Sequence, residues 1–145
     1  MLAEAGKPRR VETEIEVRYA ETDQMGVVHH ANYLVWFELA RTRLCLASGH
    51  HYGAIEKMGY LLMVTGAEVL YRRGARYGDA VKVGCWIERL GSRSLRFAYE
   101  VDRAEERLAT GATEHHWVRL ADRRPCRIPE PLAAPFRRLA GLDTE

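Results

Sequence analysis

Hydrophobic and polar residues alternate along the first part of the chain, and the period then changes. Between residues 11 and 19, apolar residues and one threonine occupy every second position, with glutamates and an arginine between them. A period of two is typical of a half-buried strand, so we expect a strand over residues 11–19. Residues 20–31 follow no regular pattern and include Gly26.

A helix is predicted from Asn32 to Ala47, because its apolar residues recur at helical spacing. The apolar positions are Tyr33, Leu34, Val35, Trp36, Phe37, Leu39, Ala40, Leu44 and Ala47. Such a wide apolar surface predicts a helix that is buried over much of its circumference. Asn32 is the predicted N-cap, and Gly49 is the predicted C-terminal stop.

Strand patterns return after a short segment at residues 52–59. We expect strands over residues 61–72, 80–90, 94–102 and 107–120, joined mainly by tight turns. Four prolines break up the C-terminal end and leave a last helical turn over residues 136–142. This order predicts an α+β fold, an antiparallel sheet with one long helix packed on it. Because one helix cannot cover both faces of five strands, the other face and the edges need charge, solvent or a partner subunit, and we expect a homo-oligomer.

The composition fits a single globular domain. The chain has 145 residues, of which 47% are hydrophobic, and its three cysteines are too scattered for a disulfide scaffold. No secretory signal is apparent, and no apolar run approaches the roughly 18 residues of a membrane helix, so we expect a cytoplasmic protein. The net charge of +2 argues against general nucleic-acid binding. An excess of arginine over lysine and a near absence of asparagine and glutamine fit either heat adaptation or codon bias.

Motifs for common nucleophiles, nucleotides and metals are missing from the sequence. There is no Gly-x-Ser-x-Gly elbow, P-loop or dinucleotide fingerprint. Cys45 and Cys85 are expected to be small core residues. The six histidines form three adjacent pairs, at 29–30, 50–51 and 115–116. Since neighbouring residues of a strand face opposite ways, and no His-x-x-x-His or Cys-x-x-Cys accompanies the pairs, we expect no metal site and no cofactor.

The irregular segment before the predicted helix holds the most informative polar residues. A helix N-terminus offers free N–H groups and a positive dipole end, which stabilise an oxyanion or a polarised carbonyl. Asp23 could act on that carbonyl as a general base or a nucleophile, and Gly26 would permit a tight turn or a close substrate approach. Spacing alone leaves a second interpretation equally open, in which Asp23 merely favours the helix dipole.

One long motif spans this segment and the start of the predicted helix. It reads Tyr19-x-x-x-Asp23-x-x-Gly26-Val-Val-His29-His30-x-Asn32-Tyr33-Leu-x-x-Phe37-Glu38-x-x-Arg41. Shorter motifs follow at Tyr77-Gly78-Asp79, Ser92-x-Ser94-x-x-Phe97, Gly111-x-Thr113-x-His115 and Arg127-Ile128-Pro129. Together they resemble the hotdog-fold acyl-CoA thioesterases, most of all the 4-hydroxybenzoyl-CoA thioesterase group with its Tol–Pal-associated members. The resemblance implies one hotdog domain over residues 1–145 with a core at about 11–129, in which a five-stranded antiparallel sheet wraps a central helix.

The resemblance also implies catalytic roles. Asp23 matches the catalytic carboxylate, which would attack the thioester carbonyl or activate water to do so. The backbone N–H near His30 would bind the thioester oxygen. His30 and Tyr19 match further functional residues of the Tol–Pal-associated type, although Tyr19 fits the last inward-facing residue of the first strand equally well.

Substrate contacts are expected on both sides of this motif. The resemblance implies binding roles for Gly26, Val28, His29 and Asn32. Arginine suits the phosphates of coenzyme A because of its forked donors, and the candidates are Arg72, Arg73 and Arg93, with Arg76 and Arg96 beside them.

The family's active site lies at a dimer interface, so the resemblance implies a homodimer or homotetramer and an acyl-CoA substrate. Two alternatives remain, an acyl carrier protein thioesterase of the same fold and a non-catalytic acyl-CoA-binding module. A hotdog dehydratase would need a His and an acidic residue from a different motif.

Overall fold

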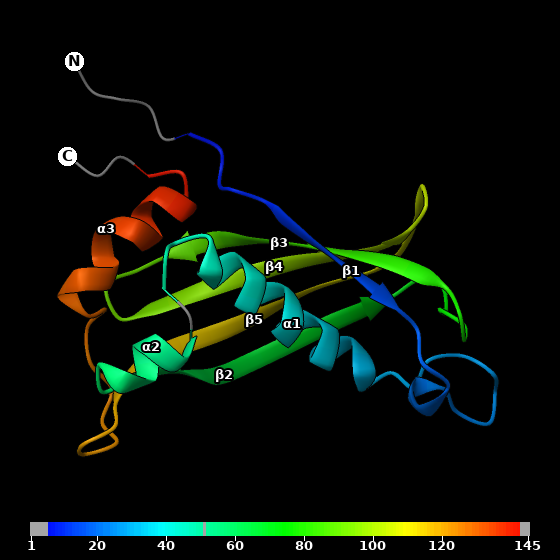
Figure 1. Ribbon diagram of the computed structural model, residues 1–145, viewed down its shortest axis with the longest axis horizontal. Helices are drawn as coiled ribbons and strands as arrows, with labels where there is room; N and C mark the ends of the chain where they lie inside the picture. The colour runs from blue at the N-terminus through cyan, green and yellow to red at the C-terminus, as the bar shows by residue number, and fades with distance from the viewer. Residues whose placement is uncertain (1–5, 51, 143–145) are drawn as a thin grey trace.

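The computed structural model describes residues 6–50 and 52–142 and confirms the predicted α+β architecture. Five strands form one antiparallel sheet in the order β1-β3-β4-β5-β2. The strands are β1 (Val11–Glu16), β2 (Tyr60–Tyr71), β3 (Ala80–Leu90), β4 (Ser94–Arg103) and β5 (Glu106–Arg119). The helices are η1 (Tyr19–Glu21), a 3₁₀ turn, and α1 (Asn32–Leu46), α2 (Tyr52–Lys57) and α3 (Glu130–Leu139). The long helix α1 lies across one face of the sheet (Figure 1).

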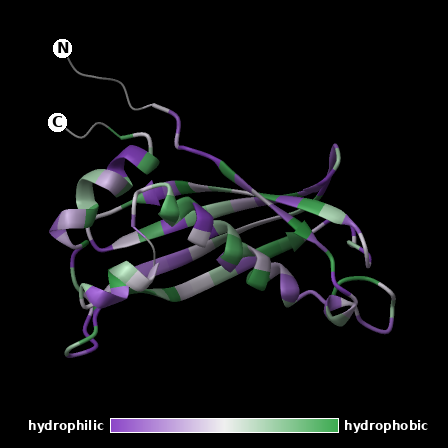
Figure 2. Ribbon diagram, viewed as in Figure 1, coloured by the Kyte–Doolittle hydropathy of each residue, from purple (hydrophilic) through white to green (hydrophobic). Residues whose placement is uncertain are grey.

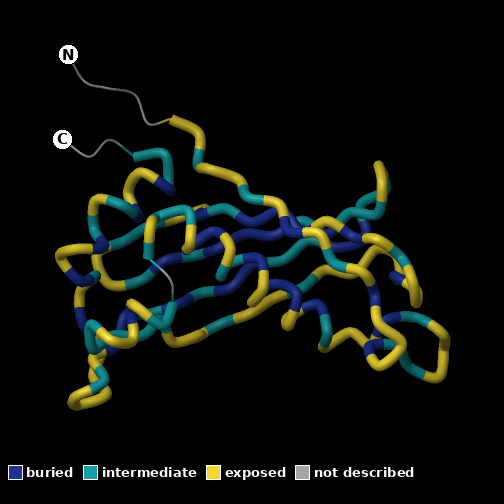
Figure 3. Tube along the Cα trace, viewed as in Figure 1, coloured by how far each residue is buried: buried dark blue, intermediate teal, exposed yellow. Residues whose placement is uncertain are grey.

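The core lies between α1 and the middle strands. Buried residues gather on β3, β4 and β5, whereas β2 contains no fully buried residue (Figure 3). Phe37 of α1 stacks on Tyr99 of β4, with ring centroids 4.1 Å apart. A Cβ atom at Gly111 would lie 2.5 Å from the Phe37 ring, so only glycine lets the helix come this close to β5.

The sheet face opposite α1 is covered by charge. Arg96 pairs there with Glu68, Glu88 and Glu114, and Arg107 pairs with neighbouring carboxylates in the same way. The expectation that this face needs charge, solvent or a partner is therefore met by ion pairs within the chain itself.

The first strand is shorter than predicted. β1 ends at Glu16, and Tyr19 opens η1 with 71% of its surface exposed, so Tyr19 is not the last inward-facing residue of a strand. The physical reason is the buried Glu21, whose carboxylate accepts a hydrogen bond from the Arg18 N–H and draws the chain into a turn. Tyr19 packs instead on Tyr77, at 5.7 Å between ring centroids.

The predicted N-cap of α1 is wrong by one residue. Ala31 is the N-cap, and Asn32 is the first helical residue. The Asn32 side chain makes no cap bond, because its Nδ2 donates to the Glu21 carbonyl at 2.9 Å and so ties the helix to the preceding loop. At the other end, α1 stops at Leu46, and Gly49 has a φ of +88° while its N–H donates to the Leu46 carbonyl. Gly49 thus ends the helical turn, as predicted.

The prediction that α1 is buried around most of its circumference does not hold for the single chain. Tyr33, Trp36 and Phe37 are buried, but Leu34, Val35, Leu39 and Leu46 are 40–49% exposed. One sheet contacts one side of a helix, and nothing else among the described residues covers these four side chains.

The C-terminal helix is longer than the predicted turn. α3 begins at Glu130 and contains Pro131 and Pro135. Pro131 is tolerated because the first helical N–H groups need no intrahelical partner. Hydrophobic and hydrophilic residues alternate along α3 (Figure 2). Leu132, Phe136 and Leu139 are buried, and their packing holds the helix although Pro135 lacks an N–H to donate. No helix within the described residues is long and apolar enough to cross a membrane.

Candidate active site

The segment between η1 and α1 folds into a small hairpin that projects at the end of the molecule away from α2 and α3 (Figure 1). Thr22 forms an antiparallel bridge with Val28, and the Asp23 N–H donates to the Val27 carbonyl at 2.9 Å. Gly26 lies at the tip with a φ of +78°, a conformation that glycine adopts without strain. The predicted tight turn at Gly26 is confirmed.

Asp23 is held by its own turn. Its Oδ1 accepts a hydrogen bond from the Met25 N–H at 2.8 Å, and its carbonyl accepts one from the Gly26 N–H at 3.0 Å. The side chain is half-buried. Within the described part of the chain, the other carboxylate oxygen, Oδ2, has no hydrogen-bond or ion-pair partner. The carboxylate is thus fixed through one oxygen and available through the other.

Glu21, which sequence reasoning missed, holds this hairpin against the helix. Its side chain is 4% exposed and accepts hydrogen bonds from Trp36 Nε1 and the Arg18 N–H, each at 2.8 Å. Its carbonyl accepts from Asn32 Nδ2 and the His29 N–H. Burial alone would raise the pKa of Glu21, but the hydrogen bonds from Arg18 and Trp36 outweigh it and lower the pKa. Glu21 and Trp36 are 15 residues apart, and no local pattern marks such a pair.

The backbone N–H groups at the start of α1 are almost all occupied. The first N–H groups of the helix, which were expected from the sequence to be free, donate to carbonyls three residues earlier in the chain. The Ala31 N–H donates to His29 Nδ1 at 3.2 Å. The occupied donors are those of Val28, His29, Ala31, Asn32, Tyr33 and Leu34. In this run, the His30 N–H is the one donor without a protein acceptor among the residues described. A single N–H is therefore left for a ligand oxygen.

A cavity of about 220 Å³ has His30 in its wall. It is lined by Val27, Val28, His30, Tyr33, Tyr71, Arg72, Arg73 and Gly74. The fold thus brings four of the predicted site residues together: Val28, His30, Arg72 and Arg73. Five other predicted site residues do not line the cavity: Tyr19 of η1, Asp23, Gly26 and His29 of the hairpin, and Asn32 at the helix start.

The loop between β2 and β3 forms the second wall of the cavity. The Val28 N–H donates to the Ala75 carbonyl at 2.8 Å, which joins this loop to the hairpin. Asp79 closes the loop by accepting hydrogen bonds from the Arg76 N–H and from Arg103 Nη1 at 2.7 Å. Burial tends to raise the pKa of Asp79, but the hydrogen bonds from Arg103 and Arg76, together with the charges of these arginines, outweigh it and lower the pKa. The Tyr77-Gly78-Asp79 motif therefore contributes to the shape of the site.

The predicted arginines separate into two groups. Arg72 and Arg73 adjoin the cavity, and Arg73 pairs with Glu106 at 3.2 Å. The Arg72 N–H bonds to the Leu108 carbonyl, whereas the Arg93 carbonyl accepts from the Trp117 N–H. Leu108 and Trp117 are nine residues apart on β5, which at about 3.3 Å per residue is about 30 Å. Within one chain, Arg93 lies far from the cavity, and its predicted contact with coenzyme A would need a second chain.

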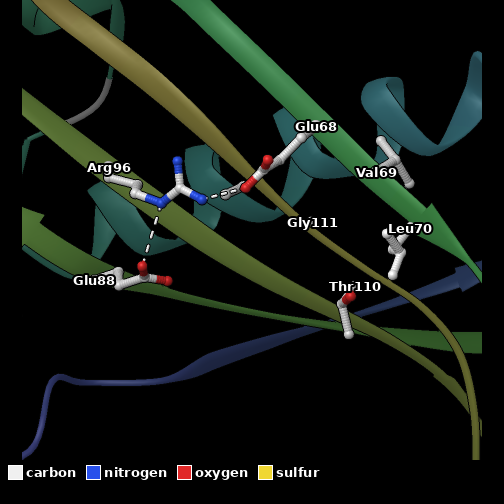
Figure 4. A pocket seen from close by; sticks show the side chains of 8 residues that line it. Glu68, Val69, Leu70, Glu88, Arg96, Thr110 and Gly111 are labelled. Atoms are coloured by element: carbon white, nitrogen blue, oxygen red, sulfur yellow. Dashed lines mark hydrogen bonds and ion pairs between the residues drawn. The ribbon is translucent and has the colours of Figure 1, made fainter.

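A larger cavity, of about 300 Å³, lies elsewhere and does not fit the predicted chemistry. It opens on the sheet face opposite α1, and the helices appear behind the strands in Figure 4. Arg96 points into it and pairs with Glu68 and Glu88. Its lining includes Arg96 but none of the predicted catalytic residues, and Arg96 is already neutralised by carboxylates. This cavity is part of the ion-pair surface.

The described cysteines and histidines away from the hairpin include three that lie in the core. Cys45 and Cys85 are fully buried, as predicted, and burial raises the pKa of Cys45 to about 12. His115 is also buried, and burial together with the charge of Arg41 lowers its pKa to about 4. Within residues 6–50 and 52–142, no three His, Cys, Asp or Glu side chains are grouped to hold a metal ion. His51 lies outside the described residues.

A helix wrapped by a five-stranded antiparallel sheet, with the site at the helix start, is the architecture of hotdog thioesterases. A family model described as the thioesterase-like superfamily matches residues 17–136, and the chain belongs to this family.

Named relatives agree with this assignment. The chain is 43% identical over 103 residues to the putative acyl-CoA thioesterase YneP of Bacillus subtilis, covering 71% of this chain and 75% of YneP. It is 31% identical to the acyl-CoA thioester hydrolase YbgC of Escherichia coli, covering 68% and 73% of the two chains. A DHNA-CoA thioesterase from Staphylococcus aureus is similar in structure, with a TM-score of 0.79, 37% identity and coverage of 82% and 80%. A hypothetical protein from Thermus thermophilus has a TM-score of 0.83, with 40% identity and coverage of 91% and 98%.

Proposed function

We propose that this protein is an acyl-CoA thioesterase that hydrolyses a thioester to a free carboxylic acid and coenzyme A. The observation that carries the proposal is that His30 lines a cavity beside the Asp23 hairpin, while its N–H has no protein acceptor among the described residues. Membership of the thioesterase-like superfamily supports it, as do the acyl-CoA thioesterase names of the relatives.

The proposed chemistry divides between the two groups. The His30 N–H donates to the thioester oxygen and stabilises the negative charge that develops there, an arrangement that elsewhere contributes 10²–10³-fold in rate. Asp23 Oδ2 then acts in one of two ways. As a general base it takes a proton from the attacking water and returns it to the leaving thiolate. As a nucleophile it forms a mixed anhydride, releases the thiolate, and is restored when water hydrolyses the anhydride.

Coenzyme A is proposed to enter along the β2–β3 loop. Arg72 and Arg73 lie on the cavity wall that this loop forms, and Arg76 follows in the same loop. A guanidinium binds phosphate oxygens through paired N–H donors, and all three side chains are exposed. His30 and Tyr19 are proposed to contact the reacting end of the substrate.

The active form is proposed to be a homodimer or a higher oligomer built on it. β2 is a 12-residue edge strand without proline, and its Met63, Val64 and Leu70 are exposed by 46%, 48% and 63%. A long apolar edge of this kind is a template for pairing with another strand. A second β2 would cover it and bring a partner close to the exposed side of α1. Light scattering after gel filtration should give at least twice the 16.6 kDa of one chain.

A thiol-release assay over a panel of acyl groups tests the proposed activity. Acyl-CoA thioesters from acetyl to palmitoyl, together with aromatic ones, are incubated with the protein, and free thiol is measured with a chromogenic disulfide. The same acyl groups on acyl carrier protein form a second panel. Turnover of acyl-CoA supports the proposal. Turnover of the carrier-protein panel alone would replace it with the carrier-protein alternative, and binding without turnover of either panel would indicate a non-catalytic module.

A further inference from the structure

Tyr71, the last residue of β2, makes a contact with the proposed oxyanion site that no sequence motif marks. Its hydroxyl donates to the His30 carbonyl at 2.8 Å, across 41 residues of sequence. Its ring stands edge-on to the His30 ring, at 6.4 Å and 87°, and to the Tyr33 ring, at 5.1 Å and 71°. The Tyr71 side chain thus contacts both the backbone and the side chain of His30.

The backbone of residue 30 has few other supports. The only other hydrogen bond to its carbonyl among the described residues comes from the Tyr33 N–H, at 3.3 Å. That distance is beyond the usual 2.7–3.2 Å for an N–H···O bond, so the contact is weak. The His30 N–H itself has no protein acceptor within the described chain. The tyrosine hydroxyl is therefore the strongest tie on this residue.

The orientation of this residue matters for the proposed reaction. The N–H and the carbonyl of His30 belong to two peptide planes that are joined at the His30 Cα atom. A bond to the carbonyl therefore anchors this Cα atom, and with it the place from which the N–H projects. An oxyanion donor must lie 2.7–3.1 Å from the position of the developing charge, and site groups need to be held within about 0.5 Å.

We propose that Tyr71 is a positioning residue, whose hydroxyl anchors the His30 backbone and so keeps its N–H within reach of the thioester oxygen. The inference rests on the proposed thioesterase function and deepens it. It also ties the site to β2, the strand proposed to pair in the dimer, so the edge strand supplies both the interface and a support of the oxyanion donor.

The hydroxyl is suited to remain a donor. Burial and the neighbouring Tyr33 raise the pKa of Tyr71, so its proton is retained at neutral pH. Its proton is engaged by the carbonyl. Loss of the hydroxyl alone should therefore act through residue 30.

Tyr71→Phe removes this hydroxyl and keeps the ring. We expect kcat to fall about tenfold to hundredfold, less than the 10²–10³-fold for loss of an oxyanion donor, because the N–H is displaced rather than removed. KM should change less than twofold. Tyr60→Phe is the matched control, since Tyr60 is at the opposite end of the same strand and lines no part of the cavity, and it should keep the wild-type kcat.

Two further measurements separate positioning from a general structural role. A non-hydrolysable acyl-CoA thioether that lacks the carbonyl oxygen should bind wild type and Tyr71→Phe with the same Kd. The His30 amide resonance should shift in Tyr71→Phe and stay in place in Tyr60→Phe, with the oligomer mass unchanged in both.

An unchanged kcat, an unmoved His30 resonance, or a Kd that weakens in step with kcat would overturn the positioning role. Failure of the proposed function has a different signature, because wild type itself would then release no thiol from any acyl-CoA.

Discussion

Two turns of this protein have the same local construction and different surroundings. In one, Asp23 Oδ1 accepts a hydrogen bond from the Met25 N–H at 2.8 Å, and in the other, Asp122 Oδ1 accepts from the Arg124 N–H at 3.1 Å. The second carboxylate oxygen of Asp122 accepts from Arg119 Nη2 at 3.0 Å, whereas that of Asp23 has no partner in the described chain. The turn alone therefore does not mark a functional acid. The feature that distinguishes Asp23, which we propose to be the functional acid, is the oxygen that has no partner among the described residues.

Glu21 is a third acid to compare with Asp23, and it lies at the end of η1, next to the hairpin. It lies two residues before Asp23, yet both of its oxygens are bonded and its side chain is buried. We interpret bonded acids as contributors to stability and the unbonded Asp23 as the contributor to chemistry. Unfolding measurements test the assignment of the bonded acids to stability, and thiol release by acid-to-amide variants tests the assignment of Asp23 to chemistry.

The largest expected change in stability comes from His115, which lies outside both turns. Its titration sets the pH range in which variants of the two turns should be compared. The pKa of buried His115 is about 4 in the folded chain, against an ordinary 6.5. Between these values the unfolded chain binds a proton that the folded chain refuses, so stability falls as pH decreases from 6.5 to 4. This difference corresponds to about 3 kcal/mol.

His115→Gln should remove that contribution. Urea unfolding at pH 4, 5.5 and 7 should give a shallower loss of stability toward acid in the variant than in wild type. Equal slopes for the two proteins would contradict the assignment. The carboxylates present in both proteins cancel in the difference, and activity assays belong above pH 6.5.

The next effect concerns the bonded Glu21. Trp36→Phe leaves a buried carboxylate oxygen without its 2.8 Å indole donor, a loss of about 1–3 kcal/mol. Trp117→Phe is the matched control, because Trp117 is equally buried and its Nε1 has no hydrogen-bond partner within residues 6–50 and 52–142. Thermal or urea unfolding should show a larger destabilisation for Trp36→Phe. The same loss in both variants would assign it to packing instead of the hydrogen bond.

The smallest effect is expected at the Asp122 turn. Arg119→Gln removes the ion pair with Asp122, but both side chains are exposed, and exposed pairs contribute little to stability. The unfolding midpoint should stay within experimental error of wild type, and thiol release should be unchanged. A change in the turnover of Arg119→Gln would contradict the assignment of the Asp122 turn to structure alone.

Much of the fold was predictable because its signals are local. The alternation along β3 and β4 and the helical spacing after Asn32 follow directly from which side chains face the core. Gly26 was predictable for the same reason, since its positive φ serves a turn of adjacent residues. The end of β1 was not, because the turn that ends it is held by the Glu21–Arg18 bond, and Glu21 is in turn bonded to Trp36, 15 residues further on.

The site was predictable in part. The motif placed Asp23 and the N–H near His30 in one segment, but it could not show that the neighbouring helical donors are already occupied. It also could not show the support from Tyr71, which comes from β2. The exposed side of α1 was predicted to be core because the sequence pattern shows that these residues are apolar but not whether the sheet reaches them.

Thiol release by Asp23→Asn and Asp122→Asn, measured side by side with wild type on its best acyl-CoA above pH 6.5, tests the central claim most directly. Both changes keep an acceptor oxygen for the turn and remove the charge, so their effects on the fold should match. The account predicts a fall in kcat of about 10²–10⁴-fold for Asp23→Asn, with wild-type turnover for Asp122→Asn and unchanged oligomer mass for both. Near-normal turnover by Asp23→Asn, or an equal loss in both variants, would contradict it.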